Sequence, residues 1–471
     1  MGEEIKTRDF TQHDFAEFSD RLGRETRLLE SLFRERGFSR RGPVAGFELE
    51  AWLVDKDGHP LPINGPYLDH LGSSLAVPEL AAFNIELNGS PTALTGNAFS
   101  RLHDELAATW AKCRACAEHF DCEVVAIGIL PTVTADDLTS EHMSDMVRYQ
   151  ALNDQLLELR HGRPFEIHID GREKFRLTHP DVMMEAGATS FQIHLQMRPE
   201  HALLTYNASC VIAAPMVAVS ANSPVFCGNV LWDETRIPLF EQAVAVGREH
   251  YPRVGLGHEY AKGSLFSCFE ENLEHYPVLI PAVHGEADER LSHVRFHNGT
   301  IWRWNRPLIG FDFDGPIHLR IEHRVCAAGQ SIRDCIANAA FYYGLVYGLI
   351  SSGEHIEASI DFATAQDNFY RAARDGLGAK VHWKDGSEVE MRTLVLSELL
   401  PLAQRGLESL GIPETDVADY LGVIQSRVAS MQNGAQWQRR WIERHGRDMS
   451  GLTRAYIERQ KTDKPVHEWA V

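Results

Sequence analysis

Hydrophobic and polar residues alternate along residues 44–55, which read Val-Ala-Gly-Phe-Glu-Leu-Glu-Ala-Trp-Leu-Val-Asp. Because side chains alternate across an extended strand, Phe47 and Leu49 point to one face and Glu48 and Glu50 to the other. Two like charges ~4 Å apart repel by about 4 kcal/mol at an effective dielectric of ~20. We therefore interpret this strand as part of a site for a bound divalent metal.

Residues 83–88, 189–197 and 318–325 alternate in the same way. Their polar faces carry Glu86, Gln192, His194, Arg320, Glu322 and Arg324. A sheet with one solvated face alternates too, but it is usually rich in Lys, Thr and Ser. Carboxylates and an imidazole favour a site for Mg²⁺ or Mn²⁺, which prefer hard oxygen ligands.

Helical spacing of apolar residues predicts helices in most of the remaining chain. They cover residues 1–40, 94–120, 146–160, 203–219, 331–350 and, without further strands, most of 362–460. Residues 165–178 predict a hairpin through Asp170-Gly171, and Glu166 and His168 there fit the alternation as well. Residues 250–295 have weak periodicity, and we interpret them as an irregular surface loop in preference to a mobile lid over a nucleotide.

These elements predict an α+β protein in which an antiparallel sheet has helices on one face and a polar site on the other. We expect an N-terminal helical segment over residues 1–40, a catalytic domain over 41–355 and an accessory helical region over 356–471.

Composition narrows the choice of partners. The 471 residues include 46 Lys and Arg against 66 Asp and Glu, a formal charge of -20, which argues against a nucleic-acid or anionic membrane partner. The N-terminus lacks the pattern of a signal peptide. The apolar stretch 335–350 is shorter than the ~20 residues of a membrane span, so we expect a buried helix and a cytoplasmic protein.

Motifs that are absent exclude several common chemistries. The chain has no P-loop and no G-x-G-x-x-G after a strand, and it has neither a G-x-S-x-G elbow nor an H-E-x-x-H helix. Eight cysteines include Cys113 and Cys116, whose spacing on a predicted helix favours a structural role over a metal site and fits a reducing compartment.

Seven short motifs in order resemble those of the glutamate–cysteine ligase family, which includes related carboxylate–amine ligases. They are Gly46-Phe-Glu-Leu-Glu50, Glu86-Leu-Asn88, Arg148-Tyr-Gln150, Gln192-Ile-His194, Ser220-Ala-Asn-Ser-Pro224, Gly299-Thr-Ile-Trp302 with Asn305-Arg-Pro307, and Glu322-His-Arg324. The resemblance covers residues 42–350. It implies a curved antiparallel sheet of the glutamine-synthetase-like type.

The resemblance also implies roles for individual residues. Two or three Mg²⁺ or Mn²⁺ ions that bind the phosphates of ATP would be held by Glu48, Glu50, Glu79, Glu86, His194 and Glu322. Glu322 and Arg324 would be catalytic, and Gln192 and Arg320 would contact the nucleotide. The substrate would be bound by Arg148, Tyr149, Asn88 and Arg236, the last near its carboxylate.

The expected reaction is ATP-dependent amide formation through an acyl phosphate, most simply between the γ-carboxyl of glutamate and cysteine or another small amine. One alternative is a metal–ATP phosphotransferase acting on a guanidino or amine acceptor, and another is a non-catalytic scaffold that retains the fold. Nothing in the sequence selects the amine or fixes the oligomeric state, for which a homodimer is the working assumption.

Overall fold

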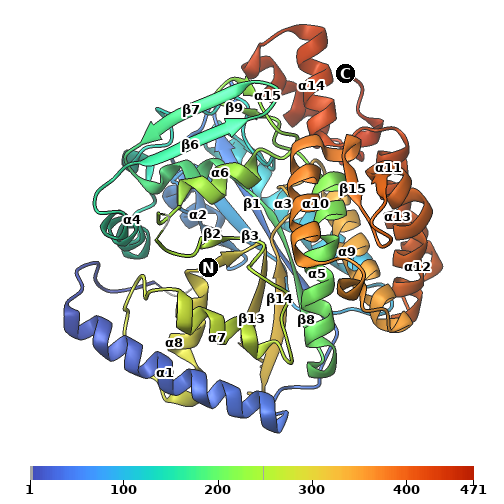
Figure 1. Cartoon of the computed structure of the whole chain (residues 1–471). Helices are drawn as coiled ribbons and strands as arrows, with labels where there is room; N and C mark the ends of the chain where they lie inside the picture. The colour runs from blue at the N-terminus through green and yellow to red at the C-terminus, as the bar shows by residue number, and fades with distance from the viewer. Residues whose placement is uncertain (1–3, 248, 314) are drawn as a thin grey trace.

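A curled antiparallel sheet forms the centre of the molecule (Figure 1). The computed structural model describes residues 4–247, 249–313 and 315–471. The eight-stranded sheet has the order β13-β14-β8-β1-β3-β2, with β4 and β5 also paired to β1. The bounds are β1 Val44–Val54, β2 Ala76–Pro78, β3 Asn84–Asn88, β4 Thr92–Ala93, β5 Glu123–Val125, β8 Phe191–Met197, β13 Asn305–Phe311 and β14 Ile317–His323.

The register of the strands brings the predicted polar positions side by side. Glu50 lies opposite Glu86 on β3, and Glu48 lies opposite Gln192 on β8. Glu322 on β14 lies opposite His194 on β8. Because opposite residues share a face, the four alternating segments form one polar surface, as predicted.

Long helices with apolar faces cover the other face of the sheet. They include α3 Ala98–His119, α5 Ala202–Ser220 and α9 Ile332–Ser352. The apolar segments Pro199–Ser220 and Ile332–Ser352 are long enough to cross a membrane, but 89% and 83% of their most hydrophobic windows are buried within the fold. Such burial is typical of core helices, and it confirms the expected buried helix at 335–350, although that helix is longer than the apolar run.

The N-terminal helix packs against a segment that comes much later in the chain. In Figure 1, α1 Gln12–Glu35 lies along α7 Phe266–His275 and α8 Ser292–Gly299. The prediction of an irregular surface loop over 250–295 is therefore wrong for α7 and for the first residues of α8, whereas most of the remaining segment is irregular. The two helices are short and are separated by a stretch that contains Pro277, Pro281 and Gly285, so that no long apolar period shows in the sequence.

Smaller elements surround one end of the sheet. The predicted hairpin is confirmed as β6 Phe165–Asp170 and β7 Lys174–His179. The others are α2 Asn64–Leu71, α4 Val147–Leu159, α6 Arg236–Ala243, β9 Val225–Phe226, β10 Asn229–Val230, β11 Val254–Gly255 and β12 Trp302–Arg303.

The C-terminal region is mostly helical and packs on α9 through α12 and α13. Its helices are α10 Phe362–Asp375, α11 Met391–Leu394, α12 Leu400–Ser409, α13 Glu414–Ala429, α14 Gly434–His445 and α15 Met449–Gln460. The prediction that no strand occurs here is wrong, because β15 Lys380–His382 pairs with β16 Glu388–Glu390. Three-residue strands are too short to show a period of two.

Candidate active site

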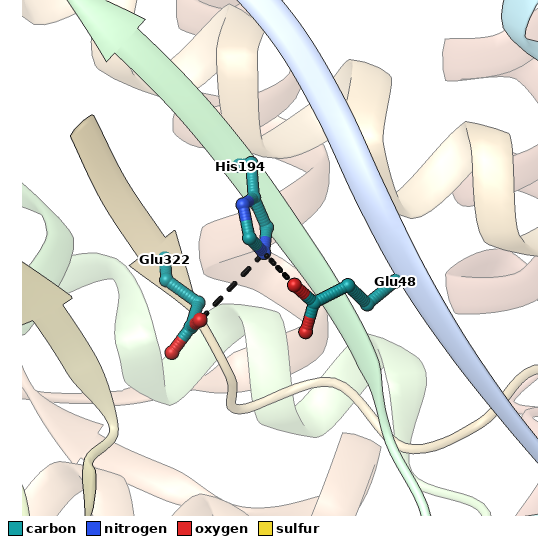
Figure 2. Close-up of side chains that lie close together, drawn as sticks. All are labelled: Glu48, His194 and Glu322. Carbon is teal, nitrogen blue, oxygen red and sulfur yellow. Dashed lines mark ion pairs between the residues drawn. The ribbon is translucent and has the colours of Figure 1, made fainter. Parts of the chain in front are cut away.

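Three side chains from three neighbouring strands converge on the polar face of the sheet (Figure 2). The Nε2 atom of His194 lies 3.3 Å from Oε1 of Glu48 and 3.7 Å from Oε1 of Glu322. The exposed fraction of the side chain is 8% for His194, 14% for Glu48 and 3% for Glu322. Among the described residues, the buried Nε2 atom has no hydrogen-bond partner, which is a common sign of a missing ligand.

The chemistry of this first group fits a divalent cation. Burial lowers the pKa of His194 to about 4, so its imidazole is neutral and can offer a lone pair near neutral pH. Carboxylate oxygens and an imidazole nitrogen within 4.8 Å of one another form a suitable donor set. Glu48, His194 and Glu322 could therefore hold one metal ion.

Two arginines hold Glu322 in its ionised form. Arg306 donates from Nε and Nη2 to the two oxygens of the carboxylate, at 2.8 and 3.0 Å, and Arg324 donates from Nη1 at 3.0 Å. Burial opposes ionisation, yet Arg306 and Arg324 keep the pKa of Glu322 well below its usual range. Arg324 also donates to the amide oxygen of Gln192.

A second group of carboxylates lies beside the first, where Glu50, Glu79 and Glu86 each bring an oxygen within 4.8 Å of the others. Glu50 accepts hydrogen bonds from the backbone and hydroxyl of Ser190 at 2.6 and 2.9 Å and from Nε2 of Gln192 at 2.8 Å. Asn88 donates to Glu86 at 2.9 Å. Gln192 and Asn88 thus orient the carboxylates of Glu50 and Glu86, respectively.

Like charges make this second group unfavourable without a cation. Burial, and then repulsion from Glu48, raises the pKa of Glu86 well above its usual value. Burial and repulsion from Glu50 raise the pKa of Glu79. A bound cation would relieve this repulsion, so the second group could hold another ion.

A cavity of about 320 Å³, called the first cavity below, lies between the polar face of the sheet and helices α4, α7 and α8. Glu48, Glu322, Arg306 and Arg320 line it from the sheet, Arg148 and Tyr149 from α4, and Phe269, His284, Arg295 and Phe296 from the outer wall. Nη2 of Arg148 donates to the Tyr149 hydroxyl at 2.9 Å. Two of the predicted substrate-binding residues therefore lie in the same cavity as the first metal group.

Arg320 lines both the first cavity and a second one of about 620 Å³. The second cavity is also lined by Arg41, Arg198 and His318. Among the described residues that line it, the acidic one is Asp312, which already accepts hydrogen bonds from Ser39, Gln196 and His318. The Nε atom of Arg320 is buried and has no hydrogen-bond partner in the described part of the chain, so its guanidinium is available to an anion.

Arg236 lies outside the lining of both cavities. Its Nε pairs with Glu234 at 3.2 Å, and its Nη2 donates to the backbone carbonyls of Arg324 and Val325 at 3.2 and 2.6 Å. These contacts fix the segment that carries Arg324. Contact with a substrate carboxylate stays a prediction.

Two residues were missed by the sequence reasoning. Arg306 lies within a quoted motif, but its pairing with Glu322 depends on the β13–β14 register. Glu185 lies in the short helix Val182–Gly187, where burial and repulsion from Glu79 raise its pKa well above the usual value. No strand period marks that helix, so the sequence contains no signal for Glu185.

Comparison with known proteins identifies relatives by sequence and by fold. Residues 44–463 match the model of glutamate-cysteine ligase family 2, whereas none of the curated proteins matches the chain. The glutamate–cysteine ligase of Francisella tularensis in complex with AMP is 12% identical, with a TM-score of 0.56 and 90% of each chain covered. A bifunctional glutathione synthetase from Pasteurella multocida is 10% identical, with a TM-score of 0.49, and the match covers 93% of this chain and 55% of that chain. The predicted glutamine-synthetase-like fold class is confirmed.

Proposed function

Because the chain belongs to glutamate-cysteine ligase family 2, we propose that it is an ATP-dependent carboxylate–amine ligase. Its simplest substrates are the γ-carboxyl of glutamate and cysteine or another small amine. The observation that carries this proposal is the convergence of two acidic groups and three arginines on one face of the sheet. A cytoplasmic location stays a prediction that accompanies it.

The chemistry requires activation of a poor electrophile. A carboxylate oxygen attacks the γ-phosphorus of ATP, the bond to the bridging oxygen breaks, and an acyl phosphate and ADP form. The amine then attacks the acyl carbon, a C–N bond forms, phosphate leaves and the amine loses a proton. Electrostatic stabilisation and positioning suffice for such transfers, and no Ser or Cys nucleophile is needed.

We assign the residues as follows. Glu48, His194 and Glu322 would hold one divalent ion and Glu50, Glu79 and Glu86 another. Such ions neutralise phosphate charge and polarise the γ-phosphoryl group when bound. Arg324 stabilises the transferring phosphoryl group, because its Nη1 lies 3.0 Å from Glu322 at the edge of the first metal group.

We assign the two cavities to different substrates. Arg320 lies between them and contacts the triphosphate, and the nucleotide extends into the second cavity, whose lining includes Arg41 and Arg198. The acid and the amine occupy the first cavity, between the carboxylates of the sheet and the outer wall.

A screen of amines with glutamate and Mg-ATP tests the proposal, with release of ADP and phosphate as the measurement. Glu48→Gln and Glu322→Gln should reduce turnover at least ~1000-fold, since each removes a charge from the first metal group. Glu118→Gln, on the exposed face of α3, is the matched control and should retain full activity.

The dependence of ADP release on the substrates separates the candidate functions. A ligase needs both the acid and the amine, whereas a phosphotransferase needs only one acceptor. Turnover near the wild-type rate in both the Glu48 and Glu322 variants would contradict the assigned site.

A further inference from the structure

Glu25 of α1 is a buried carboxylate that the proposed reaction does not use. Its side chain is 1% exposed, and its Oε1 lies 2.6 Å from Nδ1 of His293, which is fully buried. Its Oε2 accepts hydrogen bonds from the backbone N–H groups of His293 and Val294, at 2.8 and 3.0 Å. All three contacts join α1 to the first turn of α8.

Glu25 therefore caps α8 from a different helix. The residue before α8, Leu291, has a left-handed φ of 50° and provides no side-chain cap. The first N–H groups of a helix lack partners within the helix, and a local Ser, Thr, Asp or Asn usually accepts from them. Here the carboxylate from α1 does so, and its negative charge also suits the N-terminal end of the helix dipole.

The same contacts reach the segment that precedes α8. Nε2 of His293 accepts from the backbone N–H of His284 at 3.2 Å, and Nη1 of Arg21 donates to the His284 carbonyl oxygen at 2.9 Å. Because Nε2 accepts a hydrogen bond, the proton of a neutral His293 lies on Nδ1 and points at Glu25. The hydrogen bonds that His293 makes with Glu25 and with the backbone N–H of His284 thus fix the backbone of His284.

The segments held by these hydrogen bonds carry His284, Ser292, Arg295 and Phe296, which line the first cavity on the side away from the sheet. Helix α1 precedes residues 44–463, the part that matches the family model. We propose that Glu25 is a positioning residue through which α1 sets the affinity of the first cavity for the acid or the amine. This inference rests on the proposed function, in which the nucleotide extends from Arg320 into the second cavity.

Steady-state kinetics of Glu25→Gln in the full chain tests the inference. The amide keeps only one acceptor oxygen, so an N–H donor must face either the Nδ1–H of His293 or the backbone N–H groups of His293 and Val294. One set of the hydrogen bonds between α1 and α8 is therefore lost with little change of volume. The KM for the acid or the amine should rise about tenfold, while the KM for ATP stays within about twofold and kcat within about threefold. Glu30→Gln, which removes an exposed ion pair with Arg34 on the same helix, should leave the KM values and kcat unchanged.

Hydrogen exchange provides a readout that does not depend on activity. The amides of His293 and Val294 should exchange at least ~10-fold faster in Glu25→Gln than in the wild type. Arg21→Met removes the hydrogen bond to the His284 carbonyl oxygen, together with an ion pair to Glu17 on the same helix, and should raise the same KM by a smaller factor. This second variant keeps the inference testable if Glu25→Gln does not fold.

Failure of the positioning role and failure of the proposed function give different results. Unchanged exchange, unchanged KM values, or an equal rise in the KM for ATP would overturn the positioning role. If the wild-type protein shows no ADP release that depends on acid and amine, the proposed function fails, and the exchange data still decide whether α1 fixes the cavity wall.

Discussion

Glu48 and Glu322 occupy the same candidate metal group but differ in how firmly other charges hold them. Glu322 is bonded to Arg306 and Arg324, whereas Glu48 has the neutral imidazole of His194 at 3.3 Å. Neutralising Glu322 leaves two buried arginines without their counter-ion, and breaking a buried pair typically costs about 3–5 kcal/mol. Glu48→Gln is therefore the cleaner test of catalysis, because it disturbs fewer protein contacts.

Arg320 is the residue that tests the placement of ATP. Arg320→Met should raise the KM for ATP about tenfold or more, because it removes a cation proposed to contact phosphate, and should leave the KM for the acid within about twofold. Arg333→Met, in an ion pair whose side chains are 40% and 65% exposed, is the matched control. A rise confined to the KM for the acid would show that the two cavities are assigned the wrong way round.

At the scale of elements, the alternation of residues was enough to locate the four strands of the site. Their ends were less well predicted, since β14 ends at His323 and Arg324 lies just beyond it. The helices α7 and α8 were missed because each is short, with ten and eight residues respectively, so that neither has enough turns to show a clear helical period. The contact between α9 and α12 was not predicted either, because it depends on glycines of two segments that lie far apart in the sequence.

Gly406→Ala should destabilise the protein by about 1–3 kcal/mol, the usual cost of overpacking a core. A Cβ atom at Gly406 would overlap the backbone of Gly344 and Gly348 on α9. Urea unfolding measures the change in the free energy of unfolding. Gly422→Ala in α13, where a Cβ meets no atom within 4 Å, should be neutral or slightly stabilising. Equal stability of the Gly406 variant and the wild type would contradict the close packing.

For the whole molecule, the formal charge of -20 excludes a basic surface but not a local cationic site. Arg306, Arg320 and Arg324 all lie within the candidate active site, and Arg41 and Arg198 line the second cavity. A ligand as acidic as ATP can therefore bind to an acidic protein, provided that these arginines and bound cations reverse the sign of the charge locally.

Ligand binding should also stabilise the whole fold. Mg-ATP at about 100 times its dissociation constant should add about 2.7 kcal/mol to the free energy of unfolding, seen as a rise in Tm in a thermal scan. Addition of EDTA should abolish most of this rise, and Glu48→Gln should show little of it. A rise of the same size with ATP in EDTA would indicate nucleotide binding without a metal.

The sequence by itself determined which residues share the polar face, because a period of two assigns each side chain of a strand to one side whatever the strand packs against. Glu48, Glu50, Glu86, His194 and Glu322 were found in this way. Only the tertiary structure decided the partners across the sheet, such as Arg306 with Glu322, and the contact of α1 with α8. These depend on register and on packing between segments far apart in the chain, which local periodicity does not encode.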